Sequence, residues 1–253
     1  ILFHSNTFRN FKHFYLFYVC RELKKEFPDL LSYTRFVERM PRVAIPLLLF
    51  LKLGLMGECT GITFIDSTRI PVCENKRQSR NRVFKGYAQK GKSTMGWYYG
   101  FKLHLLCNER GELLNFALTR ANVDDRNPKV FNDLTKDLFG KLYADKGYIS
   151  QSLFASLFDR GVHIVTGIRT NMKNRLMDVH DKIMLRKRSI IETINDMLKN
   201  VAQIVHTRHR SISNFIVNLL AGIAAYAFYD TKPSINMEFE REEKQDVKQL
   251  TLF

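Results

Sequence analysis

The chain has 253 residues, which is enough for one large domain or two smaller ones. Hydrophobic residues make up 45% of it and aromatic residues 12%, so the composition supports a buried core and excludes an intrinsically disordered chain. The formal net charge of +15 favours a polyanionic partner such as nucleic acid, and a generally basic soluble protein is the alternative.

Residues 1–57 are expected to form a helical N-terminal segment. The stretch FRNFKHFYLFYVCRELKKEF mixes aromatic and basic residues at helical spacing, and Pro28 and Pro41 divide the segment. Two interpretations stay open, a small DNA-binding module such as a helix-turn-helix and a helical cap on the main domain. Because the chain begins with Ile1 and not with Met, we expect this segment to be truncated or processed.

The cysteine spacing and the apolar runs predict the compartment. Four cysteines occur without a C-x-x-C pair or zinc-finger spacing, so we expect free thiols in a reducing environment. The apolar runs at 45–56 and 214–229 are too short for a membrane span and contain polar residues. We therefore expect a cytoplasmic protein with no membrane contact.

Residues 58–232 are expected to form an α/β domain with a mixed sheet flanked by helices. In chain order the pattern predicts a strand at 62–73, a hairpin at 98–121, a helix from Asn127–Pro128 to Gly140, a strand at 141–148, a helix from Ser150 to Gly161, a strand at 162–169 and helices at 176–206 and 211–229. A hairpin meander followed by crossover helices favours this mixed arrangement. The charged tail at 233–253 is expected to be exposed.

Two aspartates follow apolar strand segments. Asp66 lies in FIDST, which we place at the end of an apolar strand, and Asp145 follows LYA directly before a Lys-Gly turn, on the same face as Tyr143. Charged residues at strand ends of α/β sheets often point into the crevice that holds the site. Taken singly, each aspartate is also explained by an ordinary turn or capping role.

Glu192 lies on the expected long helix, in the stretch RSIIETINDMLK. At about 100° per residue, Arg188 and Lys199 share a stripe of the helix with it. A ladder of i, i+4 charge pairs, worth a few tenths of a kcal/mol, would explain the same pattern.

The three acids together point to a metal site. Carboxylates that converge repel one another, and a divalent cation removes that repulsion. Carboxylate oxygens suit Mg²⁺ or Mn²⁺, and two such ions roughly 3.5–4 Å apart support phosphoryl transfer. We therefore predict Asp66, Asp145 and Glu192 as catalytic, metal-binding residues for two Mg²⁺ ions, which Mn²⁺ can replace.

These motifs resemble those of the DDE-type bacterial insertion-sequence transposases, and most closely the insertion-sequence 982 family. The resemblance runs from near residue 30 to the carboxyl end through FIDSTRIPVC, YYGFKLHLLCNERGELLNFALTRANVDDRNP, LYADKGYIS, IETIND and NFIVNLLAGIAAY. It implies a ribonuclease H-like fold and the same three acids as metal ligands. It also implies that a homo-oligomer binds terminal inverted repeats and target DNA.

The wider group has a Tyr-x2-Arg-x3-Glu-x6-Lys signature. Arg188, Glu192 and Lys199 fit its spacing, but Leu185 stands at the Tyr position, so a DNA contact from that position is in doubt. Arg188 and Lys199 are predicted phosphate contacts, because cations beside the metals would hold the DNA backbone.

A basic segment follows the first aspartate. Its cations are interleaved with Tyr87, Trp97, Tyr98 and Tyr99, a pattern that suits phosphates and exposed bases, and a solvated loop is the alternative. The predicted DNA-binding residues of this segment are Lys76, Arg77, Arg80, Arg82, Lys85, Lys90 and Lys92.

Three further residues have weaker assignments. His104 is expected on the face of Lys102, more as a structural histidine than as a neighbour of the metals. Asp124 and Asp125 precede a helix start, which favours a capping or turn role, and Asp125 is kept as a reserve ligand.

The sequence thus predicts a transposase that cuts DNA at element ends and transfers the strand to target DNA. Two alternatives remain, a structure-selective nuclease of the same fold and a DNA-binding remnant that does not cut. Flanking inverted repeats would separate a mobile element from a host nuclease.

Overall fold

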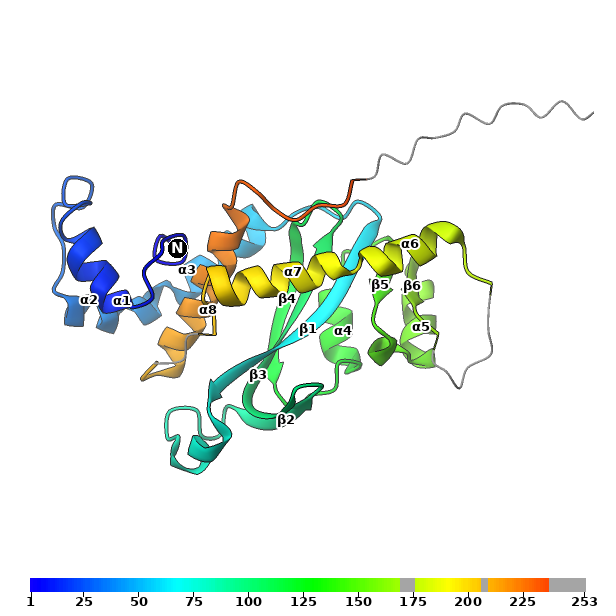
Figure 1. Cartoon of the computed structure of the whole chain (residues 1–253), viewed down its shortest axis with the longest axis horizontal. Helices are drawn as coiled ribbons and strands as arrows, with labels where there is room; N and C mark the ends of the chain where they lie inside the picture. The colour runs from blue at the N-terminus through cyan, green and yellow to red at the C-terminus, as the bar shows by residue number, and fades with distance from the viewer. Residues whose placement is uncertain (169–175, 206–208, 237–253) are drawn as a thin grey trace, which may run out of the picture.

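The computed structural model describes residues 1–168, 176–205 and 209–236, and in them a twisted sheet lies between layers of helices (Figure 1). Residue 169 of an expected strand, residue 206 of an expected helix and residues 237–253 of the charged tail lie outside the described residues. The α/β class with a mixed sheet flanked by helices is confirmed.

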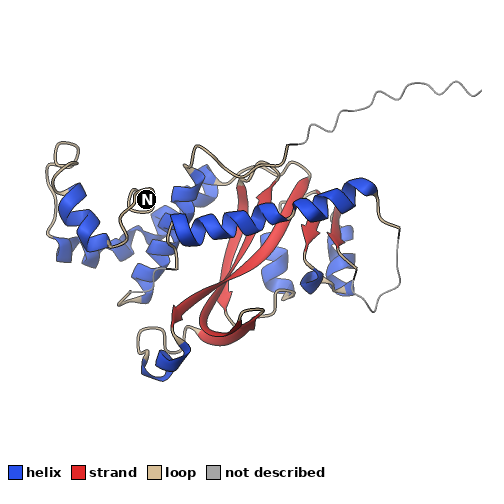
Figure 2. Ribbon diagram, viewed as in Figure 1, coloured by secondary structure: helices blue, strands red, loops and turns tan. Residues whose placement is uncertain are grey.

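Six strands form the sheet of the described chain, in the order β2-β3-β1-β5-β6, with β4 also paired to β3 (Figure 2). They are β1 (Ile62–Cys73), β2 (Gln89–Ser93), β3 (Gly96–Asn108), β4 (Leu113–Arg120), β5 (Gly140–Ala144) and β6 (Val162–Thr166). Strands β1, β5 and β6 run parallel, and β3 runs antiparallel to β1 and β4. Strand β2 was not predicted, because the polar, cationic residues 89–93 lack an apolar alternation; they pair with the first residues of β3.

The helices of the described residues agree with the prediction in order and differ in their ends. They are α1 (Phe11–His13), α2 (Tyr33–Arg39), α3 (Ala44–Phe50), α4 (Pro128–Leu134), α5 (Gln151–Phe158), α6 (Val179–Lys187), α7 (Ser189–Asp196) and α8 (Ile212–Ala227). Shorter 3₁₀ and π segments continue some of them: η1 (Phe14–Val19), η2 (Met40–Val43), η3 (Leu51–Leu55), η4 (Asn75–Arg80), η5 (Lys146–Tyr148) and η6 (Met197–Val201).

Capping explains where several helices begin. The side chain of Asn127 accepts hydrogen bonds from the backbone N–H groups of residues 129 and 130, and Ser211 caps α8 in the same way. The expected end of the first crossover helix at Gly140 is wrong, since α4 ends at Leu134 and Gly140, with φ of 80°, begins β5. The expected long helix begins at Val179 and divides into α6 and α7 at Arg188.

Strand alternation divides the core between the two faces of the sheet. Phe64 of β1 and Tyr143 of β5 lie in a cluster with the apolar residues of α7 and α8, and their rings stack at 5.5 Å between centroids. Ile65 of β1 and Leu142 of β5 lie in a second cluster with α4 and α5. In Figure 1, α6 and α7 accordingly cross one face of the sheet, with α4 and α5 on the other.

The N-terminal segment packs on α8. Helix α3 and the adjoining η2 and η3 contact α8, and Leu51 is buried in the main core. Tyr229 donates a hydrogen bond to the carbonyl of His4 at 3.2 Å. These contacts favour the helical cap of the two open interpretations, and a DNA-binding role for this segment stays a prediction.

The expectations for the thiols and the apolar runs were also examined against the structure. Cys20, Cys59, Cys73 and Cys107 all lie in the described part of the chain and form no disulfide. No helix within the described ranges has the length and apolar character needed to cross a bilayer.

The contact between α8 and the β3–β4 turn gives a stability prediction. The buried hydroxyl of Tyr226 donates to the carbonyl of Gly111 at 2.6 Å, and Gly111 holds the turn with φ of 74°. We expect Tyr226→Phe to lower the free energy of unfolding by about 1–2 kcal/mol, because a buried carbonyl loses its donor. Urea unfolding measures this, with Tyr229→Phe as the part-buried control. An equal or larger loss in the control would contradict the assignment.

Candidate active site

Asp66 lies on β1, and Asp145 directly follows β5, the parallel strand that pairs with β1. Strands β1 and β5 pair residue 62 with 141, 63 with 142 and Phe64 with Tyr143. The pairing ends there, two residues before Asp66 and Asp145, and the exposed Asp145 carboxylate accepts a hydrogen bond from the backbone N–H of Lys146 at 2.7 Å. Alternation puts both side chains on the face of Phe64 and Tyr143, which is the face that α7 crosses.

The expected position of Asp66 needs one correction. Strand β1 continues to Cys73, so Asp66 lies inside the strand and not at its end. The pairing of β1 with β5 does end next to it, because β5 ends at Ala144 and Asp145 follows as the cap of the 3₁₀ segment η5. Asp66 therefore lies two residues beyond Phe64, the last residue of β1 that pairs with β5.

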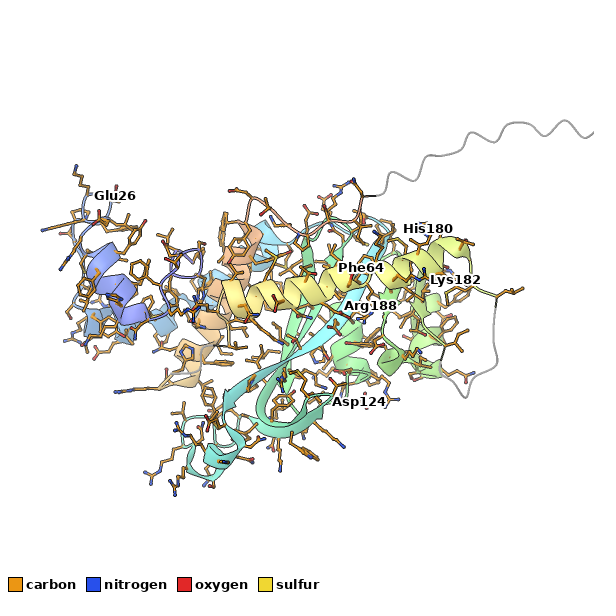
Figure 3. All side chains as sticks on the ribbon, in the orientation of Figure 1. Glu26, Phe64, Asp124, His180, Lys182 and Arg188 are labelled. Carbon is orange, nitrogen blue, oxygen red and sulfur yellow. The ribbon has the colours of Figure 1, made fainter. Side chains whose placement is uncertain are left out.

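Helix α7 supplies polar partners for the Asp66 carboxylate. Asn195 donates from Nδ2 to Oδ2 of Asp66 at 2.9 Å, and a guanidinium nitrogen of Arg188 lies 3.9 Å from Oδ1. Figure 3 places Arg188 and Phe64 at the crossing of α7 and β1. The Asp66 side chain is 24% exposed there, so a cation can still reach it.

Arg188 joins two of the predicted acids. Its Nη2 donates to Oε1 of Glu192 at 2.7 Å, one helical turn away, while Nη1 faces Asp66. The i, i+4 pair expected from the sequence is therefore present, and the same guanidinium also compensates the buried aspartate.

The charges around Asp66 oppose one another. Burial raises the pKa of Asp66 to about 6, against the lowering effect of Arg188, and the negative charges of Glu192 and Asp125 raise the pKa further. Lys199 also lies near this carboxylate, since burial and the charge of Arg69 lower the pKa of Lys199 while Asp66 raises it. The structure thus links Asp66 and Glu192 through Arg188, whereas the exposed Asp145 contacts neither of them through a hydrogen bond or ion pair among the described residues.

Asn195 was missed in the sequence analysis, which sought charged residues. It lies seven positions after Arg188, so the two differ by about 20° around the helix and share the stripe toward Asp66. The sequence did contain one signal for it: a polar residue on the apolar side of α7, between Ile194 and the buried Leu198, indicates a buried hydrogen bond.

His104 lies on the other face of the sheet. It pairs with Ser67 across β1 and β3, and its buried ring bonds from Nε2 to Thr119 at 2.9 Å. Burial lowers the pKa of His104 to about 4. Asp125, the reserve ligand, lies 3.0 Å from Lys102 Nζ and 3.8 Å from His104 Nδ1. These contacts favour a structural role for His104.

Asp124 has the turn role that the sequence favoured. Its carboxylate accepts from the backbone N–H of Arg126 at 2.8 Å and pairs with the Arg126 guanidinium at 2.8 Å. Hydrogen bonds from Arg126 hold the pKa of Asp124 well below its usual range.

The donor set suits a hard divalent cation, although the carboxylates are not gathered into a closed cage. Within the described ranges no three His, Cys, Asp or Glu side chains lie close enough together to hold a metal ion. The chemistry still fits, because Asp145 follows the strand that pairs with β1 and Asn195 has a buried carbonyl oxygen, Oδ1, with no hydrogen-bond partner among the described residues. Glu192 is held by Arg188 and would have to turn from it.

The basic segment after β1, residues 75–97, lies at one end of the sheet and is called the basic projection below; it contains η4, the edge strand β2 and the first residues of β3 (Figure 1). Its seven predicted DNA-binding cations are exposed: Lys76, Arg77, Arg80, Arg82, Lys85, Lys90 and Lys92. Trp97 is 54% exposed, with the ammonium groups of Lys90 and Lys92 at 5.0 and 5.9 Å from its ring. Tyr98 and Tyr99 are buried, so the expectation that their rings meet DNA bases is wrong.

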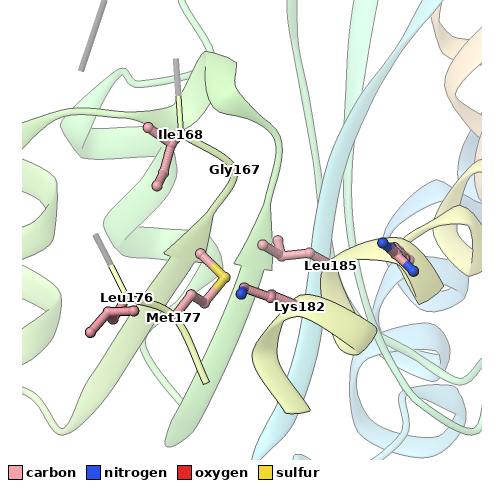
Figure 4. Close-up of a pocket in the computed structure, with 7 residues that line it drawn as sticks. Gly167, Ile168, Leu176, Met177, Lys182 and Leu185 are labelled. Atoms are coloured by element: carbon pink, nitrogen blue, oxygen red, sulfur yellow. The ribbon is translucent and has the colours of Figure 1, made fainter. Parts of the chain in front are cut away.

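Leu185, at the position of the missing signature tyrosine, lies on α6 and packs against the core. It lines a cavity of about 540 Å³ between the end of β6 and α6, together with Gly167 and Met177 (Figure 4). The residue that departs from the signature therefore faces a mainly apolar cavity, whose wall also includes Lys182 and Arg186.

Comparisons with known proteins identify related chains. Residues 56–212 match the family model described as "Transposase DDE domain". A solved structure, the piggyBac transposase synaptic complex with hairpin DNA, is similar at 12% identity and a TM-score of 0.46, over 78% of this chain and 53% of that one. The Mos1 strand transfer complex is similar at 10% identity and a TM-score of 0.30, over 83% of this chain and 67% of that one.

The chain thus spans about half the length of the piggyBac transposase chain that it matches. A search among curated proteins gave no match.

The raised pKa of Asp66 predicts a pH dependence of stability in metal-free protein. Folding raises this pKa from 3.8 to about 6, so the stability that the protonated group contributes is present below pH 4 and is lost as the pH rises through 6. We expect Asp66→Asn in EDTA to be more stable than wild type at pH 7.5 by on the order of 1–2 kcal/mol, with the difference shrinking by pH 4.

Urea unfolding at several pH values measures this difference. Asp137→Asn, which removes an exposed acid on the opposite face, serves as the control. Parallel pH profiles of wild type and Asp66→Asn would show that Asp66 does not ionise in a buried site.

Proposed function

Because the chain belongs to the transposase DDE domain family, we propose that it cuts DNA at the ends of a mobile element and joins the freed strand to target DNA. The matched residues include Asp66, Asp145 and Glu192. The closer assignment, to bacterial transposases of the insertion-sequence 982 type, rests on the motifs of the sequence.

The observation that carries the proposal is the meeting of two parallel strands and one crossing helix. Asp145 follows the strand that pairs with β1, Arg188 lies 3.9 Å from the Asp66 carboxylate, and the same guanidinium binds Glu192. Residues more than 120 positions apart in the sequence, Asp66 on β1 and Arg188 and Asn195 at α7, thus meet on one face of the sheet. A ladder of charge pairs on the helix surface would not require Arg188 to contact an aspartate on the sheet.

Asp66, Asp145 and Glu192 are the proposed ligands for two Mg²⁺ ions, with Mn²⁺ as a substitute. When bound, such ions supply charge neutralisation and an activated nucleophile for in-line attack on a phosphodiester. Arg188 and Lys199 are proposed to hold the DNA phosphates, because both lie near Asp66 and their charges complement the backbone.

The basic projection is proposed to extend the DNA contact away from the cut. From Asp66 to the end of β1 at Cys73, a rise of about 3.3 Å per residue gives roughly 23 Å, or about seven base pairs. The exposed cations of residues 76–92 then follow the DNA backbone, with Trp97 between two lysines as a surface for an unpaired base. We propose terminal inverted repeats and target DNA as the partners, bound by a homo-oligomer.

A cleavage assay on DNA that carries the element's own ends tests the proposal. We expect Mg²⁺-dependent nicking that EDTA abolishes and that Asp66→Asn, Asp145→Asn and Glu192→Gln each reduce by at least about 10³-fold, because each change removes a charge from the metal site. Asp196→Asn, an exposed acid on the same helix, is the matched control and should retain activity.

Cleavage that survives the three substitutions would exclude the proposed site. Nicking without joining to target DNA would favour a nuclease of the same fold. DNA binding without nicking would favour a remnant that only binds.

Trp97 gives a direct reading of the basic projection, because it is the one tryptophan of the chain. We expect its fluorescence to be quenched when DNA with an unpaired end is added, since the exposed ring stacks on a base. Mg²⁺ alone should leave the emission unchanged. Quenching by DNA that is equal in wild type and in protein with Lys90→Ala and Lys92→Ala would contradict the contact.

The same pair of lysines predicts the salt dependence of DNA binding. Removal of Lys90 and Lys92 should lower the slope of log affinity against log salt by up to about 2, because two phosphate contacts are lost. The matched control removes Lys129 and Lys136, two exposed lysines on the α4 side of the sheet. An equal fall in slope for the control pair would mean that the effect follows net charge and not the projection.

A further inference from the structure

Asn195 is a buried polar residue in an apolar part of α7. Asn195 is only 6% exposed, and its neighbours Ile191, Ile194 and Leu198 are fully buried in the core against the sheet. Burying an amide costs free energy unless both its ends are hydrogen-bonded. An apolar residue would pack here at lower cost, so the amide calls for an explanation beyond packing.

The two ends of this amide differ in their partners. Nδ2 donates to Oδ2 of Asp66 at 2.9 Å, between residues 129 positions apart. Oδ1 is buried and accepts no hydrogen bond from any described residue. The side chain thus fixes the carboxylate with one end and offers an unused acceptor with the other.

Arg188 and Asn195 act on different oxygens of Asp66. Arg188 faces Oδ1 at 3.9 Å and makes its shorter contact, 2.7 Å, with Glu192, whereas Asn195 binds Oδ2. An arriving cation repels the guanidinium, because like charges compete for the same oxygens. The neutral amide of Asn195 has no such conflict. It can keep its hydrogen bond to Oδ2 of Asp66 while Oδ1 of Asp66 binds the cation.

We propose that Asn195 is a positioning residue that holds the Asp66 carboxylate in the orientation for divalent cation binding. This inference rests on the proposed function, since it concerns the same site. It adds a role for a neutral residue that contributes no charge to the site. An aspartate here would repel Asp66, a lysine would retain a competing cation, and a leucine would leave Oδ2 without its donor.

The test measures Mn²⁺ affinity of the full chain by electron paramagnetic resonance, independently of cleavage. We expect Asn195→Leu and Asn195→Ala each to weaken Mn²⁺ binding by about 10- to 100-fold, as is typical when a residue that orients a metal ligand is removed. Asn195→Leu preserves the packed volume, so it separates the hydrogen bond from the filling of space. Asn200→Ala is the matched control, because Asn200 bonds to Asp196 on the exposed side of the helix.

The outcomes separate this inference from the proposed function. Failure of wild type to bind Mn²⁺, or binding that is unaffected by Asp66→Asn, would remove the metal site itself. Binding that is lost in Asp66→Asn but equal to wild type in Asn195→Leu would overturn the role of Asn195 alone.

A measurement on wild type covers the case in which the variants do not fold. On titration with Mg²⁺, we expect the side-chain amide resonances of Asn195 to shift and those of Asn200 to stay in place. An Asn195 amide that does not respond while Mg²⁺ binds would also overturn the inference.

Discussion

The arrangement depends on one contact, the crossing of α7 over β1 at Asp66. A carboxylate at this depth is costly to ionise, and the pKa of Asp66, raised to about 6 by burial, expresses that cost. Helix α7 offsets it with a guanidinium on one carboxylate oxygen and an amide on the other. Because both partners come from one helix, the position of α7 and the charge state of Asp66 are linked.

Helix α7 serves the core and the site with different sides of one short segment. Ile190, Ile191 and Ile194 pack against the sheet, while Glu192 remains at the surface. Arg188 and Asn195 lie between these sides and reach Asp66 at the edge of the apolar contact. A shift of the helix along its axis would therefore disturb packing and site together, which gives the site a rigid support.

The proposed catalytic site and the proposed DNA-contacting cations lie on different parts of the molecule. The acids and their counter-charges lie at the centre of the sheet, where β5 ends beside β1. Exposed cations gather on the basic projection, residues 75–97, which follows β1 at the other end of that strand. One strand thus joins the proposed cutting site to the proposed DNA-holding surface. Part of the net charge of +15 is concentrated on this surface, and a concentrated positive charge supports DNA as the proposed partner.

The sequence by itself determined the local elements and the chemical types of the site. Alternating apolar runs defined β1, β3, β4, β5 and β6, and the caps at Asn127 and Ser211 marked helix starts, because these signals depend on near neighbours. It did not predict β2, which forms only through its pairing with β3, nor the end of α4 at Leu134. It also placed Tyr98 and Tyr99 at the DNA surface, whereas β3 buries them.

Only the tertiary structure decided which residues meet. The pairing of β1 with β5 joins strands about 80 residues apart, and the contacts of Asp66 with Arg188 and Asn195 depend on where α7 crosses the sheet. A single sequence carries the spacing along a strand or a helix, but not the angle and depth at which two elements pack. That packing made a buried asparagine part of the candidate site, and no pattern of charges had indicated it.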